Sequence, residues 1–293
     1  MSIAEVRPTS WSALVEELFD DSFDAKLERH RSPFVFRGTT VDWPLTPSLH
    51  RMGHPQSLVP KIEKALLRSF KKYAHHEVAD GLSDWKLLSI AQHRGLPTRL
   101  LDWTFSPFVA LHFATDRLDT MSKEGVVWMV NFIESRKALP PPLTKLLEEH
   151  FAWGFSVEML EERFPKFQAI EKLSGRLPEF VMFFEPPSLD PRIVNQFGLF
   201  SLMNRPQTDL TQWLQRYGGG KKRLVKRVMI APELKWEIRD KLDQMNLTER
   251  VIYPGLDGLS LWLKRWYSPA NPKPSPAAAS PVAAPRRRPR KHR

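Results

Sequence analysis

The run GVVWMV at Gly125–Val130 limits the possible fold classes of this chain more than any other stretch. It is short, almost wholly apolar and rich in β-branched residues, which predicts a buried strand. Similar short runs occur at Pro33–Phe36, Phe180–Phe184 and Gly198–Leu202, and Leu224–Ile230 is a further predicted strand. The chain therefore needs a sheet whose faces are covered by the remaining segments.

Helical spacing of apolar residues, with Ser or Pro at several starts, predicts those covering segments. We expect helices at residues 10–24, 58–75, 85–92, 106–114, 232–245 and 255–266, and a mostly helical insertion at about 139–174. Further short strands are expected at Thr98–Thr104 and Arg250–Tyr253, and Trp43 is expected to pack inward. Helices cluster early and strands late, and the intervals near residues 185–202 favour antiparallel pairing. This order predicts an α+β fold, with one domain over residues 1–267, an N-terminal helical part and a mixed, largely antiparallel sheet.

The C-terminal residues 268–293 carry most of the net positive charge. They contain seven Lys or Arg, seven prolines and no acidic residue, which leaves about +4 of the formal +11 for the rest of the chain. This composition predicts a disordered Pro/Ala-rich basic tail. Two interpretations stay open: an arm that contacts nucleic acid or another polyanion, or a solubilising end without a dedicated partner.

Missing features exclude several classes of protein. The chain has no cysteine, which excludes disulfides, thiolate zinc sites and Cys nucleophiles. No His/Asp/Glu set has metal-ligand spacing, so no metal is expected, and no Rossmann, P-loop or G-x-S-x-G motif occurs. We see neither a signal peptide nor an apolar run of membrane-spanning length, so we expect a cytoplasmic protein without membrane contact.

Polar residues gather in residues 91–114, AQHRGLPTRLLDWTFSPFVALHFA. Ser106 and Pro107 predict a helix start, which leaves Arg99 and Asp102–Thr104 to explain. Loops seldom hold so many hydrogen-bonding groups, so we expect either a ligand site or a polar network that fixes a helix to the core. Two further polar residues have similar alternatives. Arg37, which leaves a buried strand, either binds a phosphate or pairs with Asp102, and His93 either serves as a general base or phosphate donor or bonds a backbone carbonyl.

Four separated motifs occur together: FVFRGTT, WPLTPSLHR, AQHRGLPTRLLDWTFSPFVALHFAT and DPRIVNQFGLFSL. In this order they resemble the FRG domain family over roughly Ser10 to Leu263. The family is widespread in bacteria and their phages, and the resemblance supplies a family more firmly than an activity.

A second resemblance, to ADP-ribosyltransferases of the Arg-Ser-Glu type, rests on Phe36–Gly38 and on Leu101–Ala114. It implies an ADP-ribosyltransferase-like fold that uses NAD as substrate, with the phosphates on Arg37 and the nicotinamide ribose oriented by Thr104 and Ser106. Gln196 takes the place of the late catalytic glutamate, and Glu185 and Asp257 are alternatives. The chain departs from that family, because Asp-Trp-Thr replaces Ser-Thr-Ser and no Glu-x-Glu or Gln-x-Glu occurs.

The predicted site therefore has two overlapping sets of residues. The catalytic set is Arg37, Thr104, Ser106 and Gln196, and the cofactor-binding set is Arg37, Gly38, His93, Arg99, Asp102 and Trp103. Three hypotheses arise from them. The first is an NAD-using ADP-ribosyltransferase or NAD-glycohydrolase-like enzyme that acts as a toxin or defence effector in bacterial or phage conflict. The second is a non-catalytic module that binds a nucleotide, such as a dinucleotide, or nucleic acid, and the third is a polar network that only specifies the fold.

Overall fold

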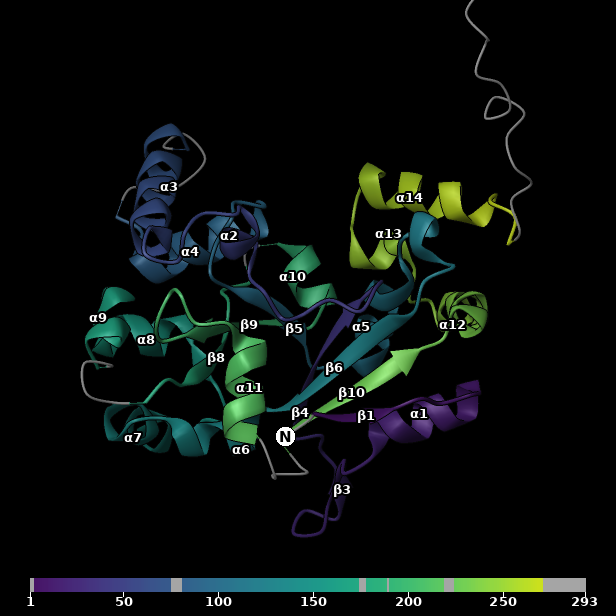
Figure 1. The fold of residues 1–293 in the computed structure, drawn as a ribbon, viewed down its shortest axis with the longest axis horizontal. Coiled ribbons are helices and arrows are strands. Elements are labelled where there is room, and N and C mark those ends of the chain that lie inside the picture. Colours follow the sequence, from purple (N-terminus) through teal and green to yellow (C-terminus); the bar gives the residue numbers. More distant parts are fainter. Residues whose placement is uncertain (1–2, 75–80, 174–177, 189, 219–223, 271–293) are drawn as a thin grey trace, which may run out of the picture.

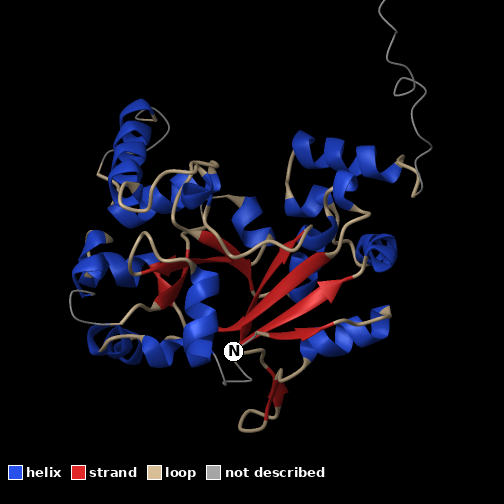
Figure 2. Ribbon diagram, viewed as in Figure 1, coloured by secondary structure: helices blue, strands red, loops and turns tan. Residues whose placement is uncertain are grey.

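The computed structural model describes residues 3–74, 81–173, 178–188, 190–218 and 224–270. Within them the chain forms an α+β fold in which helices surround one large mixed sheet (Figures 1 and 2). The predicted disordered tail falls on residues 271–293, which lie outside the described residues.

The sheet of the described residues has eight strands in the order β1-β10-β6-β4-β5-β9-β8-β7. In that order their bounds are Ala4–Val6, Val225–Ile230, Gly125–Asn131, Phe34–Thr39, Leu101–Thr104, Gly198–Met203, Val181–Glu185 and Phe155–Ser156. The edge pairs β1–β10 and β7–β8 are parallel, and the pairs between them are antiparallel. The predicted mixed, largely antiparallel sheet is thereby confirmed.

Alternating residues of the central strand β6 enter two cores, as a buried strand requires. Val127 and Met129 face helices α1 (Trp11–Phe19), α5 (Pro107–Thr115) and α12 (Pro232–Gln244). Val126 and Trp128 face the opposite core, which contains α6 (Phe132–Ser135) and α11 (Leu210–Gly218). Both sides of β6 are buried, so this strand holds the layers together.

A third core covers the half of the sheet around β8 and β9. Its helices are α3 (Val59–Tyr73), α4 (Asp84–His93), α7 (Pro141–Glu149), α8 (Val157–Arg163) and α9 (Gln168–Leu173). The last three helices belong to the stretch that the sequence predicts as a helical insertion. That stretch also supplies β7, the edge strand beside β8.

The remaining elements are short, apart from α14. They are α2 (Ser48–Arg51), α10 (Pro191–Asn195), α13 (Glu249–Ile252), α14 (Leu256–Trp266), the 3-10 turns Leu118–Thr120 and Arg136–Ala138, and the small hairpin β2 (Phe23–Asp24) with β3 (Arg29–His30). In Figure 1, α10 lies over the centre of the sheet, with α13 and α14 to its right.

Three predictions about local structure are wrong. The helix expected over residues 10–24 ends at Phe19, and Phe23–Asp24 pair with β3 as the strand β2. Arg250–Tyr253 is expected as a strand, but Glu249–Ile252 form the helical turn α13, whose Glu249 side chain is bound by Arg239 and Arg265. Tertiary ion pairs thus override the weak strand pattern. Trp43 does not pack inward, because 56% of its surface is exposed.

Candidate functional site

The centre of the sheet has a seam between β4 and β5. These two strands are registered at a single residue pair, Phe36 with Thr104, whereas β4 pairs with β6 along six residues. Beyond that pair the side chain of Arg37 links the strands instead, because its Nη1 donates to the Asp102 carbonyl oxygen at 2.7 Å. The seam therefore places charged side chains where backbone hydrogen bonds would otherwise continue.

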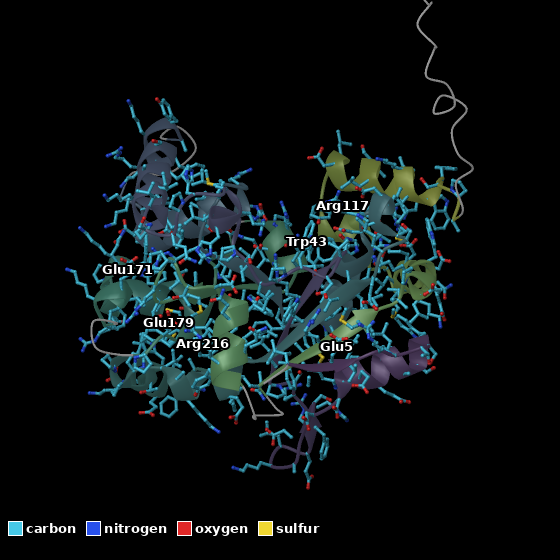
Figure 3. The ribbon with its side chains drawn as sticks, viewed as in Figure 1. Glu5, Trp43, Arg117, Glu171, Glu179 and Arg216 are labelled. Carbon is cyan, nitrogen blue, oxygen red and sulfur yellow. The ribbon has the colours of Figure 1, made fainter. Side chains whose placement is uncertain are left out.

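A cleft of about 440 Å³ opens at this seam. Its walls come from β4 and the loop after it, from β5 and the start of β9, and from the ends of α4, α5 and α10. Trp43 and Arg117, labelled in Figure 3, belong to the lining, and Phe113 adds a second aromatic ring. The volume lies within the range of small-molecule sites.

Positive charge dominates the cleft. The charged lining residues other than histidine are Arg37, Arg51, Arg117, Arg192, Asp102 and Asp116. Arg117 pairs with Asp119 outside the cleft at 2.7 Å. Among the described residues, Arg51 and Arg192 form no ion pair, and the buried Nε of Arg192 has no hydrogen-bond partner. The cleft is thus suited to an anion.

Arg37 is the most confined of these cations. Its Nη1 lies 3.7 Å from the Asp102 carboxylate, which is ion-pair distance but too long for a hydrogen bond. Burial lowers the pKa of Arg37, Asp102 opposes this effect, and the positive charge of Arg51 lowers the pKa further. Arg37 and Arg51 therefore repel each other, and an anion between them would relieve that repulsion.

Asp116 brings a perturbed carboxyl group to the same cleft. It follows α5 directly, at the negative end of the helix dipole. Burial raises the pKa of Asp116 to about 6, although Arg239 and Arg117 act to lower it. A carboxyl group that titrates near neutral pH in a cleft is a candidate general acid or base.

The His93 side chain holds α10, which forms one wall of the cleft, and is not free to contact a ligand. Its Nε2 lies 2.5 Å from Asp190 Oδ2, and only a tenth of the His93 side chain is exposed. Asp190 also caps α10 by accepting the Ile193 N–H. Burial acts to raise the pKa of Asp190, but its hydrogen bonds with Ile193 and His93 lower it. The His93–Asp190 pair therefore fixes α10, the helix that carries Arg192.

The cleft brings together seven of the nine residues in the two predicted sets: Arg37, Gly38, His93, Asp102, Trp103, Thr104 and Gln196. Several of them have structural partners. The Trp103 indole is 3% exposed and donates to Ser201 at 2.8 Å. The Thr104 hydroxyl donates to the Gln196 carbonyl oxygen at 2.7 Å. These two side chains hold the wall and have little surface left for a ligand.

Gly38 is needed for packing whatever the cleft binds. A Cβ at this position would lie 1.8 Å from the Ala110 carbonyl oxygen and 2.7 Å from the Ala114 nitrogen. Only glycine lets α5 rest directly on β4, which brings Asp116 at the end of α5 into the cleft.

Two predicted residues lie outside the cleft, and the reason is clear for each. Arg99 is 4% exposed, and its guanidinium binds Glu63 on α3 and Glu171 on α9, so it joins those helices instead of binding a cofactor here. Ser106 accepts the Val109 N–H as the N-cap of α5.

At the position expected for a late catalytic glutamate the chain has Gln196, as its sequence indicates. The Gln196 side chain lines the cleft and donates through Nε2 to the Ile252 carbonyl oxygen at 3.2 Å. Glu185 ends β8 outside the lining, and burial raises its pKa. Asp257 lies in the first turn of α14, also outside the lining. The carboxylates within the cleft are those of Asp102 and Asp116.

Sequence reasoning missed Asp116, Phe113 and Arg51 as site residues. Arg51 belongs to the motif WPLTPSLHR, and Phe113 lies on the helix predicted from Ser106. Both residues could therefore have been proposed from their places in these segments. Asp116 had none, because its pKa depends on burial that only the fold creates.

The described residues also bear on the expectations about metal and membrane. They contain no group of three or more His, Cys, Asp or Glu arranged to hold a metal ion, and the metal-free site stays a prediction. No helix in these ranges is both long and apolar enough to cross a lipid bilayer.

Comparison with known proteins identifies one shared region. Residues 32–123 match the FRG domain, from just before β4 to just after the 3-10 turn at Leu118–Thr120. Three of the four motifs lie inside this match, and DPRIVNQFGLFSL lies outside it. The match therefore covers the wall with Arg37, Arg51 and Asp116, but not α10. No curated protein and no solved structure matches the chain significantly.

Proposed function

Because residues 32–123 carry an FRG domain, we propose that the cleft built largely on this domain binds a nucleotide by its phosphates and uses NAD as a substrate. The carrying observation is the pair Arg37 and Arg51, two like charges in a cleft whose lining has four arginines and only two carboxylates. Guanidinium groups bind phosphate oxygens in a bidentate manner, which suits a diphosphate.

The reaction best matched to this cleft breaks the bond between nicotinamide and ribose. Nicotinamide leaves with the bonding electron pair, and the ribose carbon gains an oxocarbenium-like positive charge. Asp102 and Asp116 supply the carboxylates that stabilise such a charge. In the glycohydrolase reaction, water adds to that carbon and releases one proton, for which an ionised Asp116 is the acceptor. In transfer, a nucleophilic group of a target replaces water.

Aromatic side chains offer the remaining contacts of a dinucleotide. Trp43 is largely exposed at the cleft, and Phe113 lies close to Asp116 in the sequence and shares the same lining. Flat rings of this kind stack on heterocyclic bases. An enzyme of this class would act as an effector in bacterial or phage conflict by consuming NAD or modifying a target.

Calorimetry with NAD, ADP and inorganic pyrophosphate tests the binding step. We expect all three to bind, and Arg51→Ala to weaken each by about tenfold or more, because a hydrogen bond to a charged group contributes about 1.5–3 kcal/mol. Arg216→Ala is the matched control, since Arg216 pairs with Glu179 on another part of the surface. Equal affinity in the Arg51 and Arg216 variants would refute the proposed phosphate site.

Release of nicotinamide tests the chemistry separately. Incubation with labelled NAD should yield free nicotinamide, and Asp116→Asn should slow it at neutral pH. One observation favours the alternative of a non-catalytic binding module: the amide of Gln196 stands where a charged glutamate would be expected. Binding of NAD without nicotinamide or ribosylated product would support that module. Binding to nucleic acid that falls steeply with salt would identify its ligand as a polynucleotide.

A further inference from the structure

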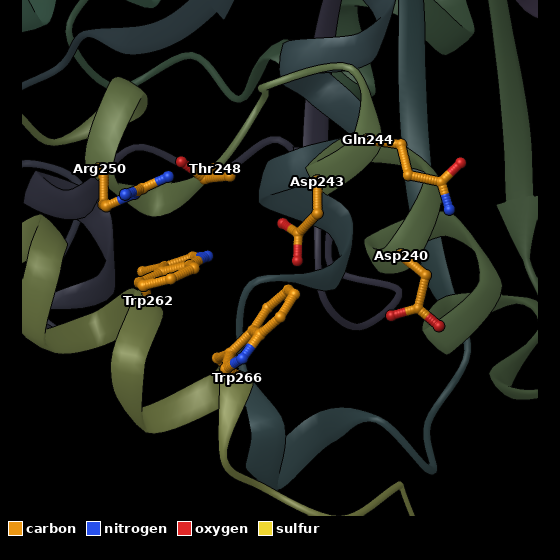
Figure 4. A pocket seen from close by; sticks show the side chains of 7 residues that line it. All are labelled: Asp240, Asp243, Gln244, Thr248, Arg250, Trp262 and Trp266. Atoms are coloured by element: carbon orange, nitrogen blue, oxygen red, sulfur yellow. The ribbon is translucent and has the colours of Figure 1, made fainter.

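A second cavity, of about 480 Å³, lies where α12, α13 and α14 meet (Figure 4). Its lining consists of Asp240, Asp243, Gln244, Thr248, Arg250, Trp262 and Trp266. None of these residues lines the cleft at the β4–β5 seam. The cavity is therefore a separate place for binding, and its occupant is independent of the function proposed for the cleft.

Two tryptophans give this cavity its character. Trp262 and Trp266 stand one helical turn apart on α14, with ring centroids 5.3 Å apart and planes at 31°. Trp266 is 55% exposed, and the Arg250 guanidinium lies 4.1 Å from the Trp262 ring centroid. Leu259 and Leu263 extend the same face of α14 and are also partly exposed. Tryptophan surface of this extent is unusual on a face without a partner.

Two buried polar groups at the cavity have no hydrogen-bond partner among the described residues. They are Nε1 of Trp262 and Oγ1 of Thr248, and only 3% of Thr248 is exposed. In Figure 4 the Nε1 edge of Trp262 is directed toward the side of the cavity where Asp243 and Trp266 lie. Buried donors nearly always have an acceptor, so the cavity lacks a group that carries one.

Charge at the cavity narrows the choice of occupant. The Asp243 carboxylate is already held by Arg265 through hydrogen bonds of 2.6 and 2.9 Å. Asp240 is exposed and forms no ion pair within the described residues. Arg250 also lines the cavity, with its guanidinium over the Trp262 ring, so the negative charge open to an occupant is that of Asp240. The fitting occupant thus has a carbonyl oxygen for the indole N–H, an apolar ring for the exposed Trp266 face and a cation placed at Asp240, away from Arg250.

We propose that the Pro/Arg-rich segment 271–293 of this same chain binds in the cavity. The described chain ends at Ala270, four residues after Trp266, so the segment starts beside the site. Its sequence NPKPSPAAASPVAAPRRRPRKHR has prolines along its length, a basic cluster at residues 286–293 and no acid. Proline-rich peptides bind aromatic grooves with their rings on the indoles and their carbonyls on donor groups.

Residues 271–293 are long enough to reach back over α14 to the cavity. Its 23 residues can span at most about 75 Å when extended, whereas the 11 residues of α14 rise about 16 Å. The prolines can therefore lie across Trp262 and Trp266, and the arginines can still reach Asp240.

The absence of cysteine from the natural sequence allows a clean test in the full chain. Cysteines are introduced by Gln244→Cys at the cavity and Ala284→Cys in the segment, and a short bismaleimide reports their proximity by intact mass. The control pairs Ala284→Cys with Lys145→Cys, an exposed position on α7 at the opposite side of the molecule in Figure 1. We expect intramolecular cross-linking several-fold higher at residue 244 than at residue 145.

Trp266→Ala is then added to the first pair. Since Trp266 is largely exposed, this change should leave the thermal midpoint near that of the parent and lower the cross-linked fraction several-fold. Equal cross-linking at residues 244 and 145, or no effect of Trp266→Ala, would overturn the proposal. Cross-linked dimers in place of monomers would also overturn it, because they would show that the segment of a second copy occupies the cavity.

Discussion

Asp116→Asn should make the protein more stable at neutral pH, although it removes a charge from a well-formed cleft. Burial holds the pKa of Asp116 at about 6, against an ordinary value of 3.8. The folded state therefore disfavours the ionised carboxylate relative to the unfolded chain. Asparagine has nearly the same shape and no charge, so it escapes that penalty.

The size of the gain follows from linkage between protonation and folding. A pKa of about 6 in place of 3.8 corresponds to about 3 kcal/mol, at about 1.4 kcal/mol per pKa unit. The folded pKa is raised, so the penalty is absent below the unfolded pKa, grows as the pH rises and is complete above the folded pKa. We expect about half of the gain at pH near 5 and all of it at pH near 8. Water in the open cleft makes about 3 kcal/mol an upper figure.

Urea unfolding of both proteins at these two pH values measures the gain. Asp257→Asn, at an exposed position on α14, controls for loss of one carboxylate, and its effect should be small and similar at both values. A stability difference for Asp116→Asn that is zero at pH near 8, or identical at the two pH values, would refute the assigned titration. A stabilising change at a cleft residue would also fit a group retained for function at the expense of stability.

Two further predictions concern the packing that supports the cleft. Gly38→Ala should destabilise the protein by about 3 kcal/mol or more in urea unfolding, because its Cβ would clash with the Ala110 carbonyl, and unchanged stability would show that α5 tolerates displacement from β4. Glu249→Gln should cost about 3–5 kcal/mol at neutral pH, because it leaves Arg239 and Arg265 with an incomplete buried ion pair. Burial acts to raise the pKa of Glu249, but Arg265 and Arg239 lower it to about 2. The parent should therefore lose this stability as the pH falls from about 4.5 toward 2, and a variant that matches the parent at neutral pH would contradict the assignment.

The strands were the most predictable part of the fold. Gly125–Val130 is identifiable because both faces of β6 are buried, and the apolar runs of β8 and β9 are identifiable for the same reason. In β10 only Val228–Ile230 continue such a run, because Lys226 and Arg227 are partly exposed. Arg250–Tyr253 was misread because three apolar or aromatic residues in a row do not distinguish a strand from a helical turn. The decisive contacts come from Arg239 on α12 and Arg265 on α14, and no local pattern displays them.

The candidate site was predictable where it lies at the ends of central strands. Arg37 and Asp102 face the same seam because β4 and β5 are neighbours. A polar residue next to a buried apolar run was therefore a usable sequence signal for a site residue. Arg99 has the same local signature, yet its partner Glu63 lies 36 residues earlier, on helix α3. Sequence alone could not separate these two arginines, because the difference lies in which carboxylate the fold brings near.

The pairing of β1 with β10 has a consequence for how the protein is made. Ala4 is registered with Lys226, so the first residues of the chain join the sheet beside a strand made roughly 220 residues later. β6 likewise lacks its β10 neighbour until that strand has left the ribosome. Non-local pairing of this kind slows folding, and unpaired strand edges expose a nascent chain to aggregation. The FRG-matched segment ends at residue 123, but its strands reach their full set of sheet neighbours only after most of the remaining chain has been synthesised. Synthesis in the cell should therefore depend on protection against aggregation during that interval.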